Sequence, residues 1–276
     1  MNNEEIRITP LGTVSPYCHN GKNCPSILVQ YGKYRILLDC GTGISNSLTL
    51  PDDLENLTII ISHLHPDHYG ELLSIAPMTY VMKRLGYLRE KIEVYIPKGD
   101  KIKTTESFLD EDGWGSSKTV DKTLPDFDYL MYLSKIGNLK MIPYQQAQKL
   151  TFDDLTITFM RNPHPLITYS IKLETDKLKI VYSSDTGYEK SNLASFAKDA
   201  NLFICESTFL RGQAKERDDH LYAYEAGLLA QKASVEKLLL THFWPDADKQ
   251  QYVEEAKEVF PNTEAAEEGK KLVLKR

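Results

Sequence analysis

The sequence predicts an α/β layered sandwich, in which helices pack outside two sheets. Short apolar runs rich in β-branched and aromatic residues recur along the chain and indicate about a dozen strands. Segments with helical periodicity and capping signals lie between some of these runs. Because the order of the elements mixes hairpins with longer crossovers, the pattern favours two sheets with helices on their outer faces.

The expected strands are runs in which isoleucine, leucine, valine and tyrosine dominate. In the N-terminal part they are residues 6–11, 27–31, 34–38 and 57–61. The later strands are expected at residues 92–96, 155–160, 169–173, 178–182, 202–205, 237–240 and 272–274.

The expected helices fall at residues 69–88, 192–198, 221–233 and 248–259. Ser191 is a suitable N-cap for the second helix, and the last helix stops before Pro261. No internal repeat or linker composition interrupts the chain, so residues 1–276 are expected to form a single domain. The least regular stretch, residues 99–137, is interpreted as an insertion that forms either a lid over a site or a surface loop.

Composition and charge narrow the possible functions. The 276 residues include 33 basic and 39 acidic side chains, and the net charge of −6 provides no basic field to attract nucleic acid. No stretch approaches about 18 uncharged apolar residues, and the first residues do not resemble a secretory signal. Four cysteines without regular spacing indicate reduced thiols. We therefore expect a soluble, cytoplasmic protein with no membrane partner.

Three of the seven histidines occupy one short run directly after an expected strand. In this run, His63-Leu64-His65-Pro66-Asp67-His68, the first two imidazoles lie two residues apart on extended backbone and face the same side. Imidazole nitrogen and carboxylate oxygen are suitable ligands for a borderline divalent metal. The run therefore predicts metal ligands at a strand-to-helix turn, which can serve two separate ions.

Further potential ligands follow three other expected strands. His164, Asp185 and His242 each lie in a loop just beyond a strand end. Taken singly, each is more often an ordinary loop residue, but together with the histidine run they favour a dinuclear metal site.

These residues resemble, in type, order and strand-end placement, the motifs of the metallo-β-lactamase fold hydrolases. The ribonuclease Z-like phosphodiesterase branch is the most similar. Residues 37–43 (LLDCGTG) resemble the first motif, the histidine run the second, and His164, Asp185 and His242 the third, fourth and fifth. The resemblance extends from Ile6 to Leu274, and it implies an αβ/βα four-layer sandwich.

The resemblance also implies roles for these residues. The residues implied for one metal ion are His63, His65 and His164, those for the other are Asp67, His68 and His242, and Asp185 is implied to bridge them. Asp39, in the first motif, is expected to support a ligating histidine from behind. An imidazole-rich ligand set suits Zn²⁺, while Mn²⁺ and Fe²⁺ stay open as alternatives.

Two sequence segments distinguish the ribonuclease Z-like branch from the other branches of this fold family. Residues 205–209 (CESTF) and 220–226 (HLYAYEA) resemble ribonuclease Z-like motifs, which implies that His220 protonates a leaving oxygen and that Glu206 orients it. Asp67 is the third catalytic candidate, because its carboxylate can hold or accept the proton of the attacking water. The simpler interpretation of His220 is an exposed histidine at a helix N-terminus. Arg211 is interpreted as a solvated surface residue, and the loop 15–23 with His19 as a possible border of the site.

We expect the reaction to be phosphodiester hydrolysis, because two adjacent cations activate a shared water and neutralise phosphate charge. A small nucleotide-type substrate such as a cyclic nucleotide is favoured over tRNA, since residues 104–128 are acidic. The first motif also lacks the glutamate and glutamine usual in tRNA 3′-end ribonucleases. The alternatives are a tRNA 3′-processing endoribonuclease of the ribonuclease Z type and an acyl hydrolase, such as a lactonase or thioesterase. The branch further implies a homodimer.

Overall fold

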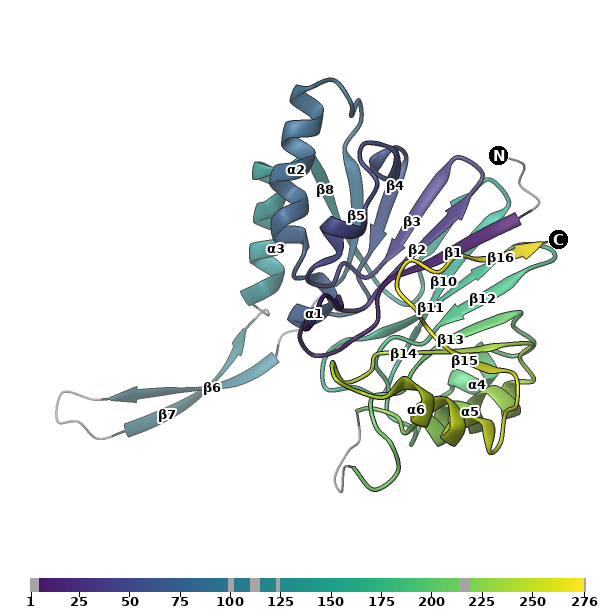
Figure 1. Ribbon diagram of the computed structural model, residues 1–276. Helices are drawn as coiled ribbons and strands as arrows, with labels where there is room; N and C mark the ends of the chain where they lie inside the picture. The colour runs from purple at the N-terminus through teal and green to yellow at the C-terminus, as the bar shows by residue number, and fades with distance from the viewer. Residues whose placement is uncertain (1–4, 99–101, 110–114, 123–124, 214–218, 276) are drawn as a thin grey trace.

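Two seven-stranded mixed sheets stack face to face in a computed structural model of the chain (Figure 1). The structure describes residues 5–98, 102–109, 115–122, 125–213 and 219–275, without the side chains of 102–109, 115–122 and 125–128. Helices lie on the outer face of each sheet, so the layers follow the order αβ/βα. The α/β four-layer sandwich expected from the sequence is confirmed.

Each sheet combines an antiparallel and a parallel half. In the first, β16 (Leu272–Lys275), β1 (Glu5–Gly12), β2 (Ser26–Tyr31) and β3 (Tyr34–Leu38) pair antiparallel. Parallel pairing then continues through β4 (Leu57–Ile60), β5 (Ile92–Pro97) and β8 (Leu139–Tyr144).

The second sheet follows the same plan in chain order. Its antiparallel strands are β9 (Lys149–Phe152), β10 (Leu155–Arg161), β11 (Tyr169–Glu174) and β12 (Lys179–Tyr182). Its parallel half continues through β13 (Leu202–Glu206), β14 (Leu238–Thr241) and β15 (Thr263–Ala265).

Three apolar cores hold the layers together. Side chains of both sheets fill the central core, among them the buried Ile8, Ile36, Ile171 and Ile180. The second core lies between the first sheet and the helices α2 (Leu72–Arg84) and α3 (Pro125–Ile136). The third lies between the second sheet and α4 (Leu193–Phe196), α5 (Ala223–Ala233) and α6 (Lys249–Lys257). Strand residues alternate between these cores, which explains why the strands read as almost continuous apolar runs.

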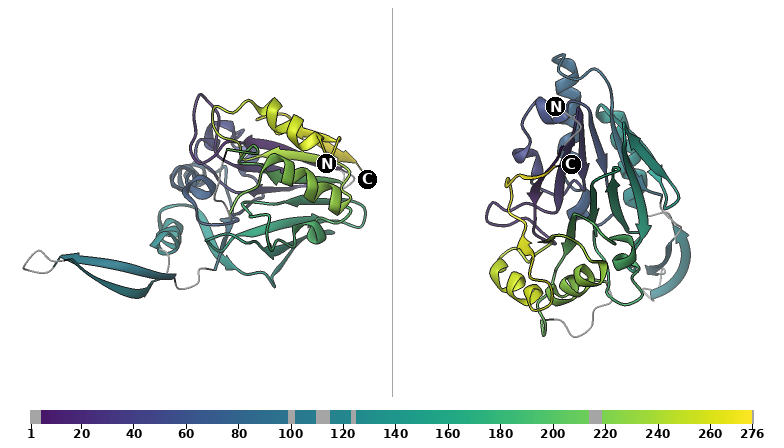
Figure 2. Two further views of the ribbon diagram at one scale, coloured as in Figure 1. Left: turned by 90° about the horizontal axis from the view of Figure 1, so that it is seen from below. Right: turned by 90° about the vertical axis from the view of Figure 1, so that its right-hand side faces the viewer.

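The stretch 99–137 contains a hairpin of β6 (Ile102–Leu109) and β7 (Gly115–Lys122), which projects from the body of the molecule (Figures 1 and 2). The C-terminal end of the stretch 99–137 is part of the main domain, because Leu130 and Leu133 of α3 are buried in the second core. The interpretation of this stretch as an insertion stays a prediction, and its Gly113 and Trp114 lie outside the described residues.

The helix expected over 69–88 is shorter in the structure, where it corresponds to α2, and a separate short helix, α1 (Pro66–Tyr69), lies before it. Glu71 lies at the break between them, where its carboxylate accepts hydrogen bonds from the Gly43 backbone N–H (2.6 Å) and from the Ser45 hydroxyl. These contacts hold the chain against the short 3₁₀ helix Ile44–Ser47, while a second 3₁₀ helix spans Asp52–Leu54. The break turns α1 and its polar side chains toward the loops at the strand ends.

Two further properties of the chain bear on its environment. All four cysteines are unpaired, with Cys18 exposed and the other three buried, as expected for reduced thiols. Within the described part of the chain, every helix is too short or too polar to cross a membrane.

Candidate metal centre

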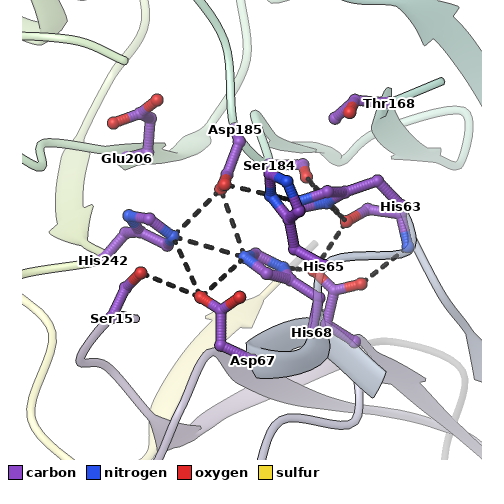
Figure 3. Close-up of polar contacts among 12 residues, drawn as sticks. Ser15, His63, His65, Asp67, His68, Thr168, Ser184, Asp185, Glu206 and His242 are labelled. Atoms are coloured by element: carbon purple, nitrogen blue, oxygen red, sulfur yellow. Dashed lines mark hydrogen bonds and ion pairs between the residues drawn. The ribbon is translucent and has the colours of Figure 1, made fainter. Parts of the chain in front are cut away.

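The seven predicted ligands come together at one edge of the two sheets, and Figure 3 labels all of them except His164. The loop after β4 carries His63 and His65, and α1 begins directly behind it with Asp67 and His68. The loops after β10, β12 and β14 carry the remaining three, which are His164, Asp185 and His242. Residues from four distant parts of the sequence therefore meet where their strands end.

The potential ligand atoms form two groups. Those of the first group, from His63, His65, His164 and Asp185, lie within 4.8 Å of one another. The same limit applies to the second group, from Asp67, His68 and His242. This division matches the two sets that the family resemblance implies, although the binding of metal by these residues stays a prediction.

Asp185 lies between the two groups and directs one carboxylate oxygen to each. Its Oδ2 is 3.4 Å from His63 Nε2 on one side. On the other side, its Oδ1 is 3.3 Å from His68 Nε2 and 3.1 Å from His242 Nε2. A carboxylate in this position can bind two cations at once.

Asp39 supports the centre from behind, as expected from its place in the first motif. Its buried carboxylate accepts hydrogen bonds from His68 Nδ1 (2.8 Å), Tyr182 Oη (2.7 Å) and the Ser62 backbone N–H (2.6 Å). Because His68 donates through Nδ1, its Nε2 is the ring nitrogen that faces the centre. Gly41 follows on the same turn, where a Cβ atom would lie only 2.4 Å from the Asp67 carbonyl oxygen, so the two motifs pack in direct contact.

Hydroxyl groups hold three other imidazoles in position. None of the residues that carry these hydroxyl groups was predicted from the sequence. Thr168 Oγ1 lies 2.8 Å from His164 Nδ1, and Thr208 Oγ1 lies 2.8 Å from His242 Nδ1. Ser62 Oγ lies 3.1 Å from His63 Nδ1. Each contact occupies Nδ1 and turns Nε2 toward the centre. Serine and threonine are common in loops, so the sequence offers no signal that separates these three from the others.

The donor set fits metal ions better than it fits hydrogen bonding within the protein. His63 Nε2 faces His65 Nδ1 at 3.1 Å, and His68 Nε2 faces His242 Nε2 at 3.3 Å. Ring nitrogens that approach one another beside buried carboxylates form the type of donor set that a divalent cation binds. Among the described residues, the buried His164 Nε2 also has no hydrogen-bond partner. Buried polar atoms that converge without partners indicate a site for cations.

The pKa shifts at the centre also favour a site for cations. Burial and the neighbouring His68 lower the pKa of His63 to about 4, and burial and His63 lower that of His164 to about 3. These two imidazoles are therefore neutral near pH 7. Burial also opposes a charge on His242, but the Asp185 carboxylate outweighs it and raises the pKa of His242 to about 10. The buried carboxylates thus favour positive charge at the centre.

His220 and Glu206 lie together beside the ligand groups. His220 Nδ1 is 3.1 Å from Glu206 Oε1 and 4.0 Å from Asp185 Oδ2. The Glu206 carboxylate is buried and accepts hydrogen bonds from Thr208 Oγ1 (2.7 Å) and the Leu221 backbone N–H (3.2 Å). Burial lowers the pKa of His220, but Glu206 more than compensates and the net shift is upward.

The remaining sequence-predicted residues divide between the centre and the surface. The loop 15–23 does border the site, because Ser15 Oγ donates a 2.8 Å hydrogen bond to Asp67 Oδ2. Arg211 pairs with Glu255 and Glu258 on or beside α6, as expected for a surface arginine. His19 is exposed and lies 3.7 Å from Asp246. Asp219, which sequence reasoning did not consider, has a carboxylate oxygen within 4.8 Å of ring nitrogens of His164 and His220.

Comparison with known proteins places these residues in a family context. Residues 6–262 match the family model described as anti-Pycsar protein Apyc1. The probable metallo-hydrolase YhfI of Bacillus subtilis is 29% identical, with 92% of this chain and 94% of that protein covered. Ribonuclease Z of Clostridium acetobutylicum is also 29% identical, over 92% of this chain and 93% of its own length.

Solved structures agree with the sequence matches. The crystal structure of the metallo-β-lactamase fold protein YhfI from Bacillus subtilis superposes with a TM-score of 0.81 at 26% identity, covering 98% of this chain and all of the other. Human tRNase Z, short form, superposes with a TM-score of 0.66 at 18% identity, over 96% of this chain and 98% of its own. The chain therefore has the metallo-β-lactamase fold, with ribonuclease Z-like relatives.

Proposed function

The chain belongs to the anti-Pycsar protein Apyc1 family and is a metallo-hydrolase of the metallo-β-lactamase fold, and from this premise we propose that it cleaves phosphodiester bonds in a small nucleotide-type substrate, such as a cyclic nucleotide. The observation that carries the proposal is the contact between His220 and Glu206 beside the ligand groups. A general acid beside the centre meets a need of phosphodiester hydrolysis, because a sugar alkoxide is a poor leaving group until it is protonated.

We propose that the two ligand groups bind two divalent cations, with Zn²⁺ as the metal that an imidazole-rich set prefers and Mn²⁺ as the alternative. Asp185 is the shared ligand, because its two oxygens face different groups. When bound, such a pair of ions makes a water molecule acidic enough to supply hydroxide near neutral pH and neutralises charge on a phosphate.

The protein's own side chains supply the proton transfers. Ser15 donates to Asp67 Oδ2 and so orients that carboxylate, whose other oxygen can accept a proton from the attacking water. Glu206 accepts from His220 Nδ1 and directs the opposite ring nitrogen, Nε2, away from itself. From there His220 can donate a proton to the departing alkoxide oxygen. Asp67, His220 and Glu206 are thus the proposed catalytic group, with Glu206 acting through His220.

The charge of the chain favours a small substrate over a long polyanion. With 33 basic and 39 acidic residues, the chain offers little attraction to a long polyanion, whereas a small diester needs to be neutralised only at one phosphate. Cleavage of RNA is the second candidate, and the similarity to ribonuclease Z of Clostridium acetobutylicum favours it. A homodimer, which the ribonuclease Z-like branch implies, is part of the same proposal.

A substrate panel tests the proposal. Protein loaded with Zn²⁺ or Mn²⁺ is assayed with bis-p-nitrophenyl phosphate, cyclic nucleotides, a precursor tRNA and a lactone, and chelator-treated protein serves as the control. We expect metal-dependent cleavage of the two kinds of small diester, and a lower kcat/KM for the tRNA and the lactone. Turnover of the lactone with no cleavage of any diester would instead identify an acyl hydrolase.

A further inference from the structure

A pocket of about 470 Å³ opens on the surface between the loops that follow β13 and β14 and the first part of α6. Its volume lies in the range of roughly 300–1,000 Å³ that is usual for small-ligand sites. Two of its lining residues, Tyr17 and Trp244, are large aromatic side chains that are 54% and 37% exposed. Such exposure is unusual for tryptophan, which is mostly buried. The pocket therefore exposes two aromatic side chains to solvent, and none of its lining residues is a proposed metal ligand.

Ring contacts connect this pocket to the proposed acid. The Trp244 ring lies 5.9 Å from the Phe209 ring, and the Phe209 ring lies 6.1 Å from that of His220. His220 is in turn stacked on His242, with ring centroids 5.3 Å apart. Consecutive ring contacts thus connect the centre to the pocket, from His242 through His220 and Phe209 to Trp244.

Two further contacts fix the pocket relative to the centre. Tyr252 forms part of the lining, and its hydroxyl donates to the backbone carbonyl of Thr208, whose side chain holds His242. On the opposite side, the backbone N–H of Ser15 donates to the Phe243 carbonyl at 2.8 Å, and Ser15 Oγ donates to Asp67. Tyr17 follows two residues after Ser15, so it belongs to a loop that is held in place by the centre.

We propose that this pocket binds the heteroaromatic base of the substrate, with Trp244 and Tyr17 as the surfaces on which the base stacks. The inference rests on the proposed function, since it requires a nucleotide whose phosphate lies at the centre. A nucleotide carries an anionic phosphate and a flat unsaturated ring, and the protein places Trp244 two ring contacts away from His220, through Phe209. Aromatic stacking suits any base, because every base has a π-face.

The main test compares two substrates that differ only in the base. These are a nucleoside 3′,5′-cyclic monophosphate and ribose 3′,5′-cyclic phosphate, which has no base. For the metal-loaded protein we expect a preference for the nucleotide, expressed as the ratio of the two kcat/KM values. Trp244→Ala should reduce this ratio by about 10- to 100-fold, mainly through a higher KM for the nucleotide. Trp244→Phe should restore part of the preference.

Tyr80→Ala serves as the matched control, because Tyr80 is an aromatic residue that is 50% exposed on α2, beside the other sheet. Its preference ratio should equal that of the unmodified protein. A ratio near one in the unmodified protein, or an unchanged ratio in Trp244→Ala, would overturn the base site and leave the proposed function intact. Failure of the metal-loaded protein to cleave either compound would instead contradict the proposed function.

A binding measurement decides the inference even without turnover. The chain has two tryptophans, so Trp114→Phe leaves Trp244 as the only one. Titration of this variant with a nucleoside monophosphate should quench its tryptophan fluorescence, and ribose 5-phosphate should not, because only a stacked base contacts the indole. Equal responses to the two compounds, or none to either, would contradict the assignment of Trp244 to the base.

Discussion

Replacing Asp185 by alanine is expected to lower metal occupancy at both positions of the centre. The two carboxylate oxygens face different ligand groups, so a single substitution removes a ligand from each. Loss of a residue that only supports a ligand typically costs 10–100-fold in metal affinity, and the loss of a shared ligand should exceed about 100-fold. Elemental analysis of protein purified without chelator, followed by competition with a chelator, measures the effect.

Glu267→Ala is the control for this substitution, because Glu267 is an exposed carboxylate, with 62% of its side chain accessible. It should retain the full metal content of the unmodified protein. Circular dichroism should show the same secondary structure in both variants. If Asp185→Ala loses one ion and keeps the other at full occupancy, the bridging role is assigned to the wrong residue.

Replacing His220 by alanine should slow the reaction in proportion to the basicity of the leaving group. An alkoxide leaves poorly without a proton, so a diester with an alkyl leaving group should react about 10²–10⁴-fold more slowly. A nitrophenolate is a stable anion, so bis-p-nitrophenyl phosphate should lose less than about tenfold. The measurement is the pair of rate ratios, variant over unmodified protein, at equal metal content.

Two companion variants sharpen this result. Glu206→Gln keeps the size of the side chain but removes the charge that faces His220 Nδ1 at 3.1 Å, so it should reproduce part of the selective defect. His19→Ala removes an exposed histidine and should change neither ratio. Equal ratios for the two diesters in His220→Ala would exclude the acid role and favour an acyl hydrolase.

The part of the fold that was predictable from the sequence is the part with the strongest local signals. Strands β4, β12 and β14 lie in the interior of their sheets, and their continuous apolar runs mark them clearly. Proposed ligands such as His63 and His242 stand out because they follow such strands, and imidazole is rare in this chain. Where parallel strands end at a common edge, residues far apart in sequence meet, so the clustering follows from the topology.

The strands that the sequence did not predict lie at the edges of the two large sheets or in the separate hairpin of β6 and β7. Among them β8, β9 and β15 are edge strands, and β9 and β15 span only Lys149–Phe152 and Thr263–Ala265. An edge strand has one hydrogen-bonded neighbour and contacts less core, so it needs fewer apolar residues. The hairpin of β6 and β7 lies outside both sheets and forms a two-stranded sheet of its own.

The supporting contacts of the site were harder to predict than its ligands. The histidines can be found by composition, but Thr168, Thr208 and Ser62 act through single hydroxyl groups that only the folded backbone positions. Ser15 illustrates the same point, since it reaches Asp67 across 52 residues of sequence. Aromatic residues at the pocket, such as Trp244, likewise become informative only once their distance from His220 is known.

The central claim is that this chain is a hydrolase whose activity on phosphodiesters depends on two cations bound by one cluster of residues. Metal-free protein titrated with Zn²⁺ or Mn²⁺, with cleavage of bis-p-nitrophenyl phosphate measured at each step, tests the claim most directly. We expect binding and rate to rise together and to reach their plateau at about two equivalents per chain. Binding of no metal, or a rate that is the same with and without bound metal, would contradict it.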